Sequence, residues 1–243
     1  MPIANSQLPS QRYPELDLAR LLAMLMMAVY HTAFDLSFFY GWSIDLEKPT
    51  WVSLQKSTLI LFLLVNGVSA TIAWQRSHNL TKFFRRGLTL LFWSMIITLT
   101  TIIMSPEDYI RFGILHCIAI ATLLLPFLLP LKLWNAPLGV TIILLGSRVT
   151  GRTVSTSLLL PIGFLPPIFH TLDYVPLIPW FGVILLGSAF GHVLYVRGLR
   201  PRELALAPWI HTLSTPGKYS LVFYLVHQPV ILAILVVMVG LPR

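Results

Sequence analysis

Long apolar runs recur along the whole chain and leave few folds open to it. A helix that spans a bilayer needs about 20 consecutive apolar residues, with a range of roughly 17–25. Six of the runs reach that length and one is shorter; in order they cover 16–40, 51–74, 84–104, 113–131, 136–148, 177–196 and 219–240. The sequence therefore predicts an all-α fold, a polytopic transmembrane helical bundle of about seven spans.

The composition supports this fold class and excludes two others. Of the 243 residues, 56% are hydrophobic and 11% charged, and the mean hydropathy is +0.78. A soluble domain carries about 25% charged residues, and a disordered chain carries few apolar ones, so neither class fits. We expect a single transmembrane domain over 1–243, in which 1–12 form a flexible arm. The one cysteine, Cys117, cannot form an internal disulfide, and no Cys or His spacing predicts a metal site.

Basic residues are distributed unevenly over the segments between the apolar runs. With the N-terminus placed in the cytoplasm, the inner segments hold ten Lys and Arg residues and the outer segments five. Cytoplasmic segments of membrane proteins carry an excess of these residues, so the split predicts 75–83 and 197–217 inside and 41–50 and 149–176 outside. The net charge of +8 then reflects topology and contact with membrane lipids, and we expect no nucleic-acid partner.

The stretch from Gly151 to Pro179 contains five prolines within an otherwise apolar segment. Non-helical backbone at membrane depth is tolerated only where it is buried in protein or lines a cavity. This stretch is therefore a candidate cavity wall.

Four ionisable residues lie on one face of the first run. At about 100° per residue, Arg20, His31 and Asp35 fall within roughly 60° of Asp17. Such a stripe is too costly to face lipid, so it faces the bundle interior or an aqueous cavity. His31 and Asp35 have i,i+4 spacing, which suits a general base oriented by a carboxylate, or a polar pair that only stabilises packing. Asp17 and Arg20 have i,i+3 spacing, which favours an interfacial ion pair, with contact to a phosphate as the alternative.

Further polar residues lie in or beside the other runs and are candidates for the acceptor side of a site. Each is also compatible with an interhelical hydrogen bond alone; they are Asn66, His116, His170, Asp173 and His227. No Gly-rich phosphate loop, G-x-S-x-G elbow or H-E-x-x-H motif occurs.

Several segments together resemble the catalytic-domain family of heparan-α-glucosaminide N-acetyltransferases, in its small prokaryotic-type form. The resemblance covers about residues 12–232 and is most specific in Asp173–Gly182. The segments that carry it are Glu15–Arg20 (ELDLAR), Met26–His31 (MMAVYH), Asp35-Leu36, Phe112–His116 (FGILH), Asp173–Gly182 (DYVPLIPWFG) and Tyr219–Pro229 (YSLVFYLVHQP).

This resemblance implies an integral membrane acyltransferase of the prokaryotic cytoplasmic membrane. Such enzymes take acetyl-CoA from the cytosolic side and acetylate an amino sugar on the other side, without a metal. Their active-site pattern has an Asn late in the first helix and a His in the following outer loop. Here His31 lies at the Asn position, and the loop from Gly41 to Thr50 contains no histidine.

The resemblance also suggests roles for individual residues. We expect His31 to be the base or acyl carrier, oriented by Asp35, with His116 as the competing base; direct transfer and an acyl-histidine route both stay open. The expected contacts to acyl-CoA are Asp17, Arg20, Arg85 and Arg86, and those to a small-molecule or glycan acceptor are Asn66, His170, Asp173 and His227. Homodimerisation is left open.

Two other functions fit the same residues. A line of His and Asp across a membrane also suits a proton-coupled transporter, although the paired repeats frequent in transporters are absent from the sequence. In a non-catalytic membrane subunit, the charged stripe would serve assembly alone.

Overall fold

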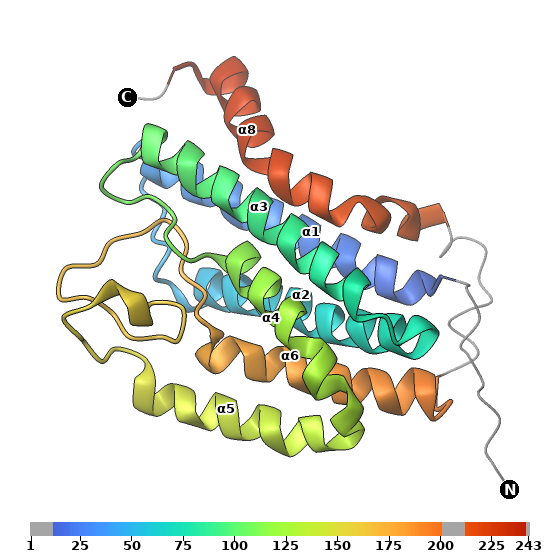
Figure 1. The fold of residues 1–243 in the computed structure, drawn as a ribbon. Helices are drawn as coiled ribbons and strands as arrows, with labels where there is room; N and C mark the ends of the chain where they lie inside the picture. The colour runs from blue at the N-terminus through green and yellow to red at the C-terminus, as the bar shows by residue number, and fades with distance from the viewer. Residues whose placement is uncertain (1–11, 201–211, 242–243) are drawn as a thin grey trace, which may run out of the picture. The chain divides into compact units, whose positions relative to one another are not determined.

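The computed structural model describes residues 12–200 and 212–241, so that of the predicted N-terminal arm only Arg12 lies within the described residues. Regular structure in these ranges is helical, apart from two isolated bridges that join Phe112 to Tyr174 and Thr153 to Leu165. The α-helices are α1 (Pro14–Phe38), α2 (Pro49–Ser77), α3 (Leu80–Met104), α4 (Ile114–Leu128), α5 (Asn135–Val149), α6 (Leu177–Gly191) and α8 (Ser220–Val239) (Figure 1). Shorter helical turns are η1 (Leu129–Trp134), η2 (Ser157–Leu159), η3 (His192–Val196) and η5 (Thr215–Tyr219).

Helices long and apolar enough to cross a bilayer make up most of the described chain. Six segments meet this description: Pro14–Phe38, Pro49–Ser77, Leu80–Met104, Ile114–Val149, Leu177–Val196 and Thr212–Val239. The fourth segment is not one straight helix, because Lys132 in η1 has a φ of 54° and a ψ of −113°. The chain turns back there, and α4 and α5 run as separate antiparallel helices (Figure 1). The prediction of an all-α polytopic membrane bundle is confirmed.

The chain divides into two compact units, each with its own helix packing. One unit includes Leu63–Arg200, and the other comprises Arg12–Phe62 together with Pro201–Arg243. In the first unit, α5 and α6 approach closely through glycines: a Cβ added to Gly139 would lie 2.7 Å from the Gly182 carbonyl oxygen. The Thr71 hydroxyl of α2 donates to the Ser188 carbonyl of α6 at 2.9 Å. Small residues and interhelical hydrogen bonds of this kind are typical of helix packing in membranes.

In the second unit, α1 and α8 run in the same direction. Near their starts, Gly217 packs against the backbone of Asp17, where an added Cβ would lie 1.9 Å from the Asp17 carbonyl oxygen. Beyond their ends, the Tyr40 hydroxyl donates to the Gly240 carbonyl at 2.9 Å. The first and last membrane helices of a chain are parallel only when the number of crossings is odd. Seven crossings, with α4 and α5 counted separately, meet this condition, whereas six do not.

The α5 helix is short for a crossing, as expected from the run 136–148. Its 15 residues rise about 22 Å at about 1.5 Å per residue, against about 30 Å for the hydrocarbon core.

The polar face of α1 points inward, as its spacing predicted. Asp17, Met24 and Asp35 are buried, whereas Leu22 and Val29 on the opposite face are each more than half exposed, at 52% and 54%. The exposed face of α1 is therefore apolar, while Asp17 and Asp35 of the ionisable stripe are buried and Arg20 and His31 are partly buried.

The Pro-rich segment between α5 and α6 is irregular apart from η2. The Tyr174 hydroxyl donates to the Leu160 carbonyl at 2.8 Å, and the Val154 N–H donates to the Leu165 carbonyl at 2.8 Å. The two cavities described in the structure are lined by other segments, so a role for this segment as a cavity wall stays a prediction.

Candidate functional site

In the unit that contains both α1 and α8, these helices bring four polar side chains together. The imidazole rings of His31 and His227 lie 4.9 Å apart between centroids, at an interplanar angle of 63°. One turn further along α1, the Gln228 amide nitrogen donates a hydrogen bond to Oδ1 of Asp35. We call His31, Asp35, His227 and Gln228 the α1–α8 cluster.

The tautomer of His227 follows from its backbone contact. Its Nδ1 lies 2.7 Å from the carbonyl oxygen of Tyr224. A carbonyl oxygen only accepts hydrogen bonds, so Nδ1 carries the proton and donates it. In a neutral imidazole the other nitrogen, Nε2, then has the lone pair. The ring also stacks on Phe223 at 5.9 Å and 12°, which holds Nε2 in position to accept a proton.

Each of the four residues of the α1–α8 cluster contributes one buried polar atom that has no hydrogen-bond partner. These atoms are Nδ1 of His31, Oδ2 of Asp35, Nε2 of His227 and Oε1 of Gln228. Buried polar atoms are normally hydrogen-bonded, and each one left unpaired costs about 1–3 kcal/mol. Four such atoms from two facing helices form a place where a polar ligand with hydrogen-bond donors would be stabilised.

The structure does not contain the direct His31–Asp35 hydrogen bond that the i,i+4 spacing suggested. The spacing does place both residues on the inner face of α1, but α8 supplies the partners: an amide donor for Asp35 and a second imidazole for His31. Gln228 was not among the predicted site residues. The signal for it was present, since His227 and Gln228 are two consecutive polar residues within the apolar run 219–240.

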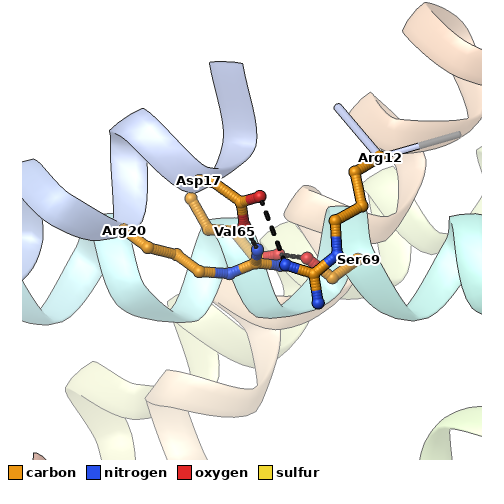
Figure 2. Close-up of polar contacts among 5 residues, drawn as sticks. All are labelled: Arg12, Asp17, Arg20, Val65 and Ser69. Atoms are coloured by element: carbon orange, nitrogen blue, oxygen red, sulfur yellow. Dashed lines mark hydrogen bonds and ion pairs between the residues drawn. The ribbon is translucent and has the colours of Figure 1, made fainter. Parts of the chain in front are cut away.

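At the start of α1, Asp17 forms ion pairs with two arginines. Figure 2 shows the guanidinium groups of Arg12 and Arg20 converging on its carboxylate. The pair with Arg20 confirms the i,i+3 expectation, while the pair with Arg12, at 3.8 Å, was not predicted. The Asp17 side chain is 5% exposed and that of Arg12 61%, so one buried carboxylate is neutralised from the surface of the unit. Contact of Arg20 with a phosphate stays a prediction.

His116 lies in the unit that includes Leu63–Arg200, and hydrogen bonds occupy both of its ring nitrogens. The Gly113 N–H donates to Nδ1 at 3.3 Å, and Nε2 lies 3.3 Å from the Thr98 hydroxyl oxygen. That hydroxyl donates to the Ile110 carbonyl at 2.8 Å, so it accepts from the imidazole. The arrangement ties the start of α4 to α3, which favours a structural role for His116 over that of a base.

Asp173 caps the same helix. Its Oδ2 accepts a hydrogen bond from the Ile114 N–H at 2.9 Å, which supplies a partner for one of the N–H groups left open at the start of α4. Burial raises the pKa of the Asp173 carboxyl from 3.8 to about 6, and the Ile114 hydrogen bond opposes part of that rise. His170, three residues earlier, is exposed on the loop.

A small cavity in this unit is lined by Arg86 and not by its neighbour Arg85. The cavity has a volume of about 130 Å³ and is lined by Asn66, Ala70, Ala73, Lys82, Phe83, Arg86 and Thr122. Arg85 and Arg86 are both exposed, and only Arg86 is part of the lining. Of the basic residues expected to contact a nucleotide donor, Arg86 therefore lines this cavity.

The fold and the α1–α8 cluster define an all-helical polytopic membrane protein with a buried polar cluster between two of its helices. The comparison with known families is more specific: residues 12–229 match the family described as heparan-alpha-glucosaminide N-acetyltransferase, catalytic. The match spans most of the chain, and the protein belongs to this family, whose name denotes an N-acetyltransferase. No curated protein and no solved structure matches the chain. Among the described residues, no group of three or more His, Cys, Asp or Glu side chains is arranged to hold a metal ion.

Proposed function

We propose that the protein is a transmembrane acyltransferase of a prokaryotic cytoplasmic membrane. It moves an acyl group, most simply acetyl, from acyl-CoA on the cytoplasmic side to a hydroxyl or amine acceptor, such as a sugar, on the outer side. Family membership supports the reaction type, and the Lys and Arg distribution supports the orientation.

The observation that carries the proposal is the set of unpartnered atoms in the α1–α8 cluster. An acceptor hydroxyl or amine offers the N–H and O–H donors that Oδ2 of Asp35 and Oε1 of Gln228 lack. Binding would therefore relieve part of the cost of burying these atoms, about 1–3 kcal/mol for each. The acceptor brings these hydrogens on the atom that reacts, which suits the cluster to the acceptor.

The two imidazoles supply the proton chemistry. Nε2 of His227 takes the proton from the acceptor O–H or N–H while the acceptor atom attacks the thioester carbonyl carbon. The C–S bond breaks as the new acyl bond forms, and the imidazolium returns the proton to the leaving CoA sulfur. His31 hydrogen-bonds the acceptor from the position of the family's Asn, and His227 provides the imidazole that the loop from Gly41 to Thr50 lacks. Positioned general base catalysis of this kind contributes about 10²–10⁴-fold to a rate.

The test is acyl transfer by the purified full chain in detergent. Release of the CoA thiol from acetyl-CoA is followed with a panel of amino sugars and sugar alcohols, in the wild type and in the His31→Ala and His227→Ala variants. We expect acceptor-dependent thiol release in the wild type and losses of about 10²-fold or more in the His227→Ala variant. His78→Asn removes an exposed imidazole outside the cluster and should leave the rate unchanged.

The alternatives give different results in the same preparation. A proton-coupled transporter would show no thiol release but would acidify or alkalinise reconstituted vesicles, and this flux would be lost in the histidine variants. A non-catalytic subunit would show neither activity.

A further inference from the structure

The cavity beside Arg86 is a built site whose chemistry nothing described so far uses. Three helices of one unit form it: Asn66, Ala70 and Ala73 come from α2, Lys82, Phe83 and Arg86 from α3, and Thr122 from α4. A single water needs roughly 10–15 Å³ of such space, so a volume of about 130 Å³ accommodates a group several times larger.

The lining is cationic. Lys82 and Arg86 have i,i+4 spacing on α3, so both reach the same face of the helix. Lys82 also lies in the first turn of α3, where the Asn79 side chain accepts from its backbone N–H at 3.1 Å, and the start of a helix favours an anion.

The third polar wall residue restricts the ligand further. Oδ1 of Asn66 is buried and has no hydrogen-bond partner. Because this atom only accepts, a bare inorganic anion without hydrogens would leave it unpaired. A ligand that fits both features combines a negative group with an O–H or N–H donor.

Positive charge alone would not distinguish a ligand site from basic residues that anchor helix ends at a membrane surface. The cavity and the buried Oδ1 atom of Asn66 without a hydrogen-bond partner favour a ligand site. Basic side chains that only extend toward the interface would require neither feature. Arg85 provides the internal comparison, because it neighbours Arg86 in sequence, carries the same charge and lies outside the lining.

We propose that this cavity binds a phosphate ester that carries its own hydrogen-bond donor, with Lys82 and Arg86 on the phosphate oxygens and Asn66 on the donor. Two sources have this chemistry: the phosphorylated ribose end of an acyl-CoA, with its hydroxyl, and a phospholipid headgroup such as phosphatidylglycerol or phosphatidylethanolamine. The first source rests on the proposed acyltransferase function, and the second does not.

The test measures equilibrium binding to the delipidated full chain in detergent. The probes are CoA, dephospho-CoA and short-chain phosphatidylglycerol, with short-chain phosphatidylcholine as the probe that has a phosphate but no donor. The variants are Lys82→Gln, Arg86→Gln and Asn66→Asp, and Arg85→Gln is the matched control. Asn66→Asp keeps the shape of the side chain and places a carboxylate beside Lys82 and Arg86, so the protein stays folded while the anion is repelled.

We expect one of the phosphate probes to bind the wild type and to lose tenfold or more in affinity in each of the three cavity variants. Arg85→Gln should change the affinity less than twofold. A loss confined to CoA, with dephospho-CoA weaker, identifies the nucleotide source, and a loss confined to phosphatidylglycerol identifies the lipid source. Phosphatidylcholine should bind more weakly than phosphatidylglycerol.

The proposal is overturned if no phosphate probe responds to Lys82→Gln and Arg86→Gln, or if Arg85→Gln has the same effect as Arg86→Gln. Acyl transfer measured in the same variants separates this result from the proposed function. If the cavity variants bind every phosphate probe as the wild type does and still transfer the acyl group, the cavity is rejected and the enzyme stands. A different outcome is a wild type that binds only phosphatidylglycerol through the cavity and transfers no acyl group. That result would support the cavity as a binding site and reject the proposed acyltransferase function.

Discussion

His31 of α1 and His227 of α8 face each other with ring centroids 4.9 Å apart, although 196 positions separate them in the sequence. Each has one ring nitrogen that is buried without a hydrogen-bond partner. Two imidazoles in contact, beside a carboxylate bound by an amide, form the reactive centre that we propose.

Asparagine variants separate the two imidazoles. Asn forms hydrogen bonds but cannot take up a proton, so His227→Asn should lower kcat by about 10²–10⁴-fold. His31→Asn restores the residue of the family pattern and should cost less than tenfold. Steady-state kinetics of both variants, with acetyl-CoA affinity as a check on folding, measure the difference. The reverse order of losses would make His31 the base.

The Asp35–Gln228 hydrogen bond should stabilise the α1–α8 pair. Gln228→Leu leaves a buried carboxylate oxygen without its donor, and we expect a loss of about 1–3 kcal/mol in the free energy of unfolding. Asp35→Asn keeps an acceptor oxygen for the Gln228 amide and should cost clearly less. Reversible unfolding of both variants in mixed micelles gives the values. An Asp35→Asn loss as large as that of Gln228→Leu, or no loss in Gln228→Leu, would contradict this role for the hydrogen bond.

Patterns within one helix were the part of the site that the sequence could predict. The apolar runs anticipated the helices, and a period of about 3.6 residues placed Asp17 and Asp35 on the buried face of α1. The Asp17–Arg20 ion pair was predictable for the same reason, because both residues lie within one turn of the same helix.

Contacts between side chains of different helices could not be predicted from residue spacing. Whether Asp35 pairs with His31 on its own helix or with Gln228 on α8 depends on how the two helices pack, and helix periodicity carries no information on that. The same holds for Arg85 and Arg86: their charges are identical, and only the packing of α2, α3 and α4 shows which one lines a cavity.

Asp173 should make stability depend on pH. Its carboxyl has a pKa of about 6 in the folded protein against 3.8 as its ordinary value, because burial disfavours the charged form. The folded state therefore holds this proton more tightly than the unfolded state, and stability should fall as the pH rises from about 4 to about 6. Asp173→Asn keeps an acceptor for the Ile114 N–H and removes the titration. The melting temperature measured at several pH values in this window should decline in the wild type relative to Asp173→Asn. Parallel profiles would contradict the assignment.

The parallel arrangement of α1 and α8 predicts that α5 crosses the membrane. Leu131, just before α5, and Arg152, just after it, should then lie on opposite sides. Single cysteines at these positions, in a Cys117→Ser background, are labelled in sealed, oriented vesicles with an impermeant maleimide. We expect Leu131→Cys to react from the cytoplasmic side and Arg152→Cys from the outer side. Labelling of both from one side would show that α5 does not cross.

Vectorial transfer tests the central claim most directly. The purified chain is reconstituted in sealed vesicles of known orientation, with acetyl-CoA on the cytoplasmic side and an impermeant amino sugar only on the opposite side. The account predicts an acetylated sugar on its own side of the membrane and free CoA thiol on the other, with both products lost together in His227→Asn. No acetylated sugar in any orientation, or transfer that is unaffected by the loss of both His31 and His227, would contradict it.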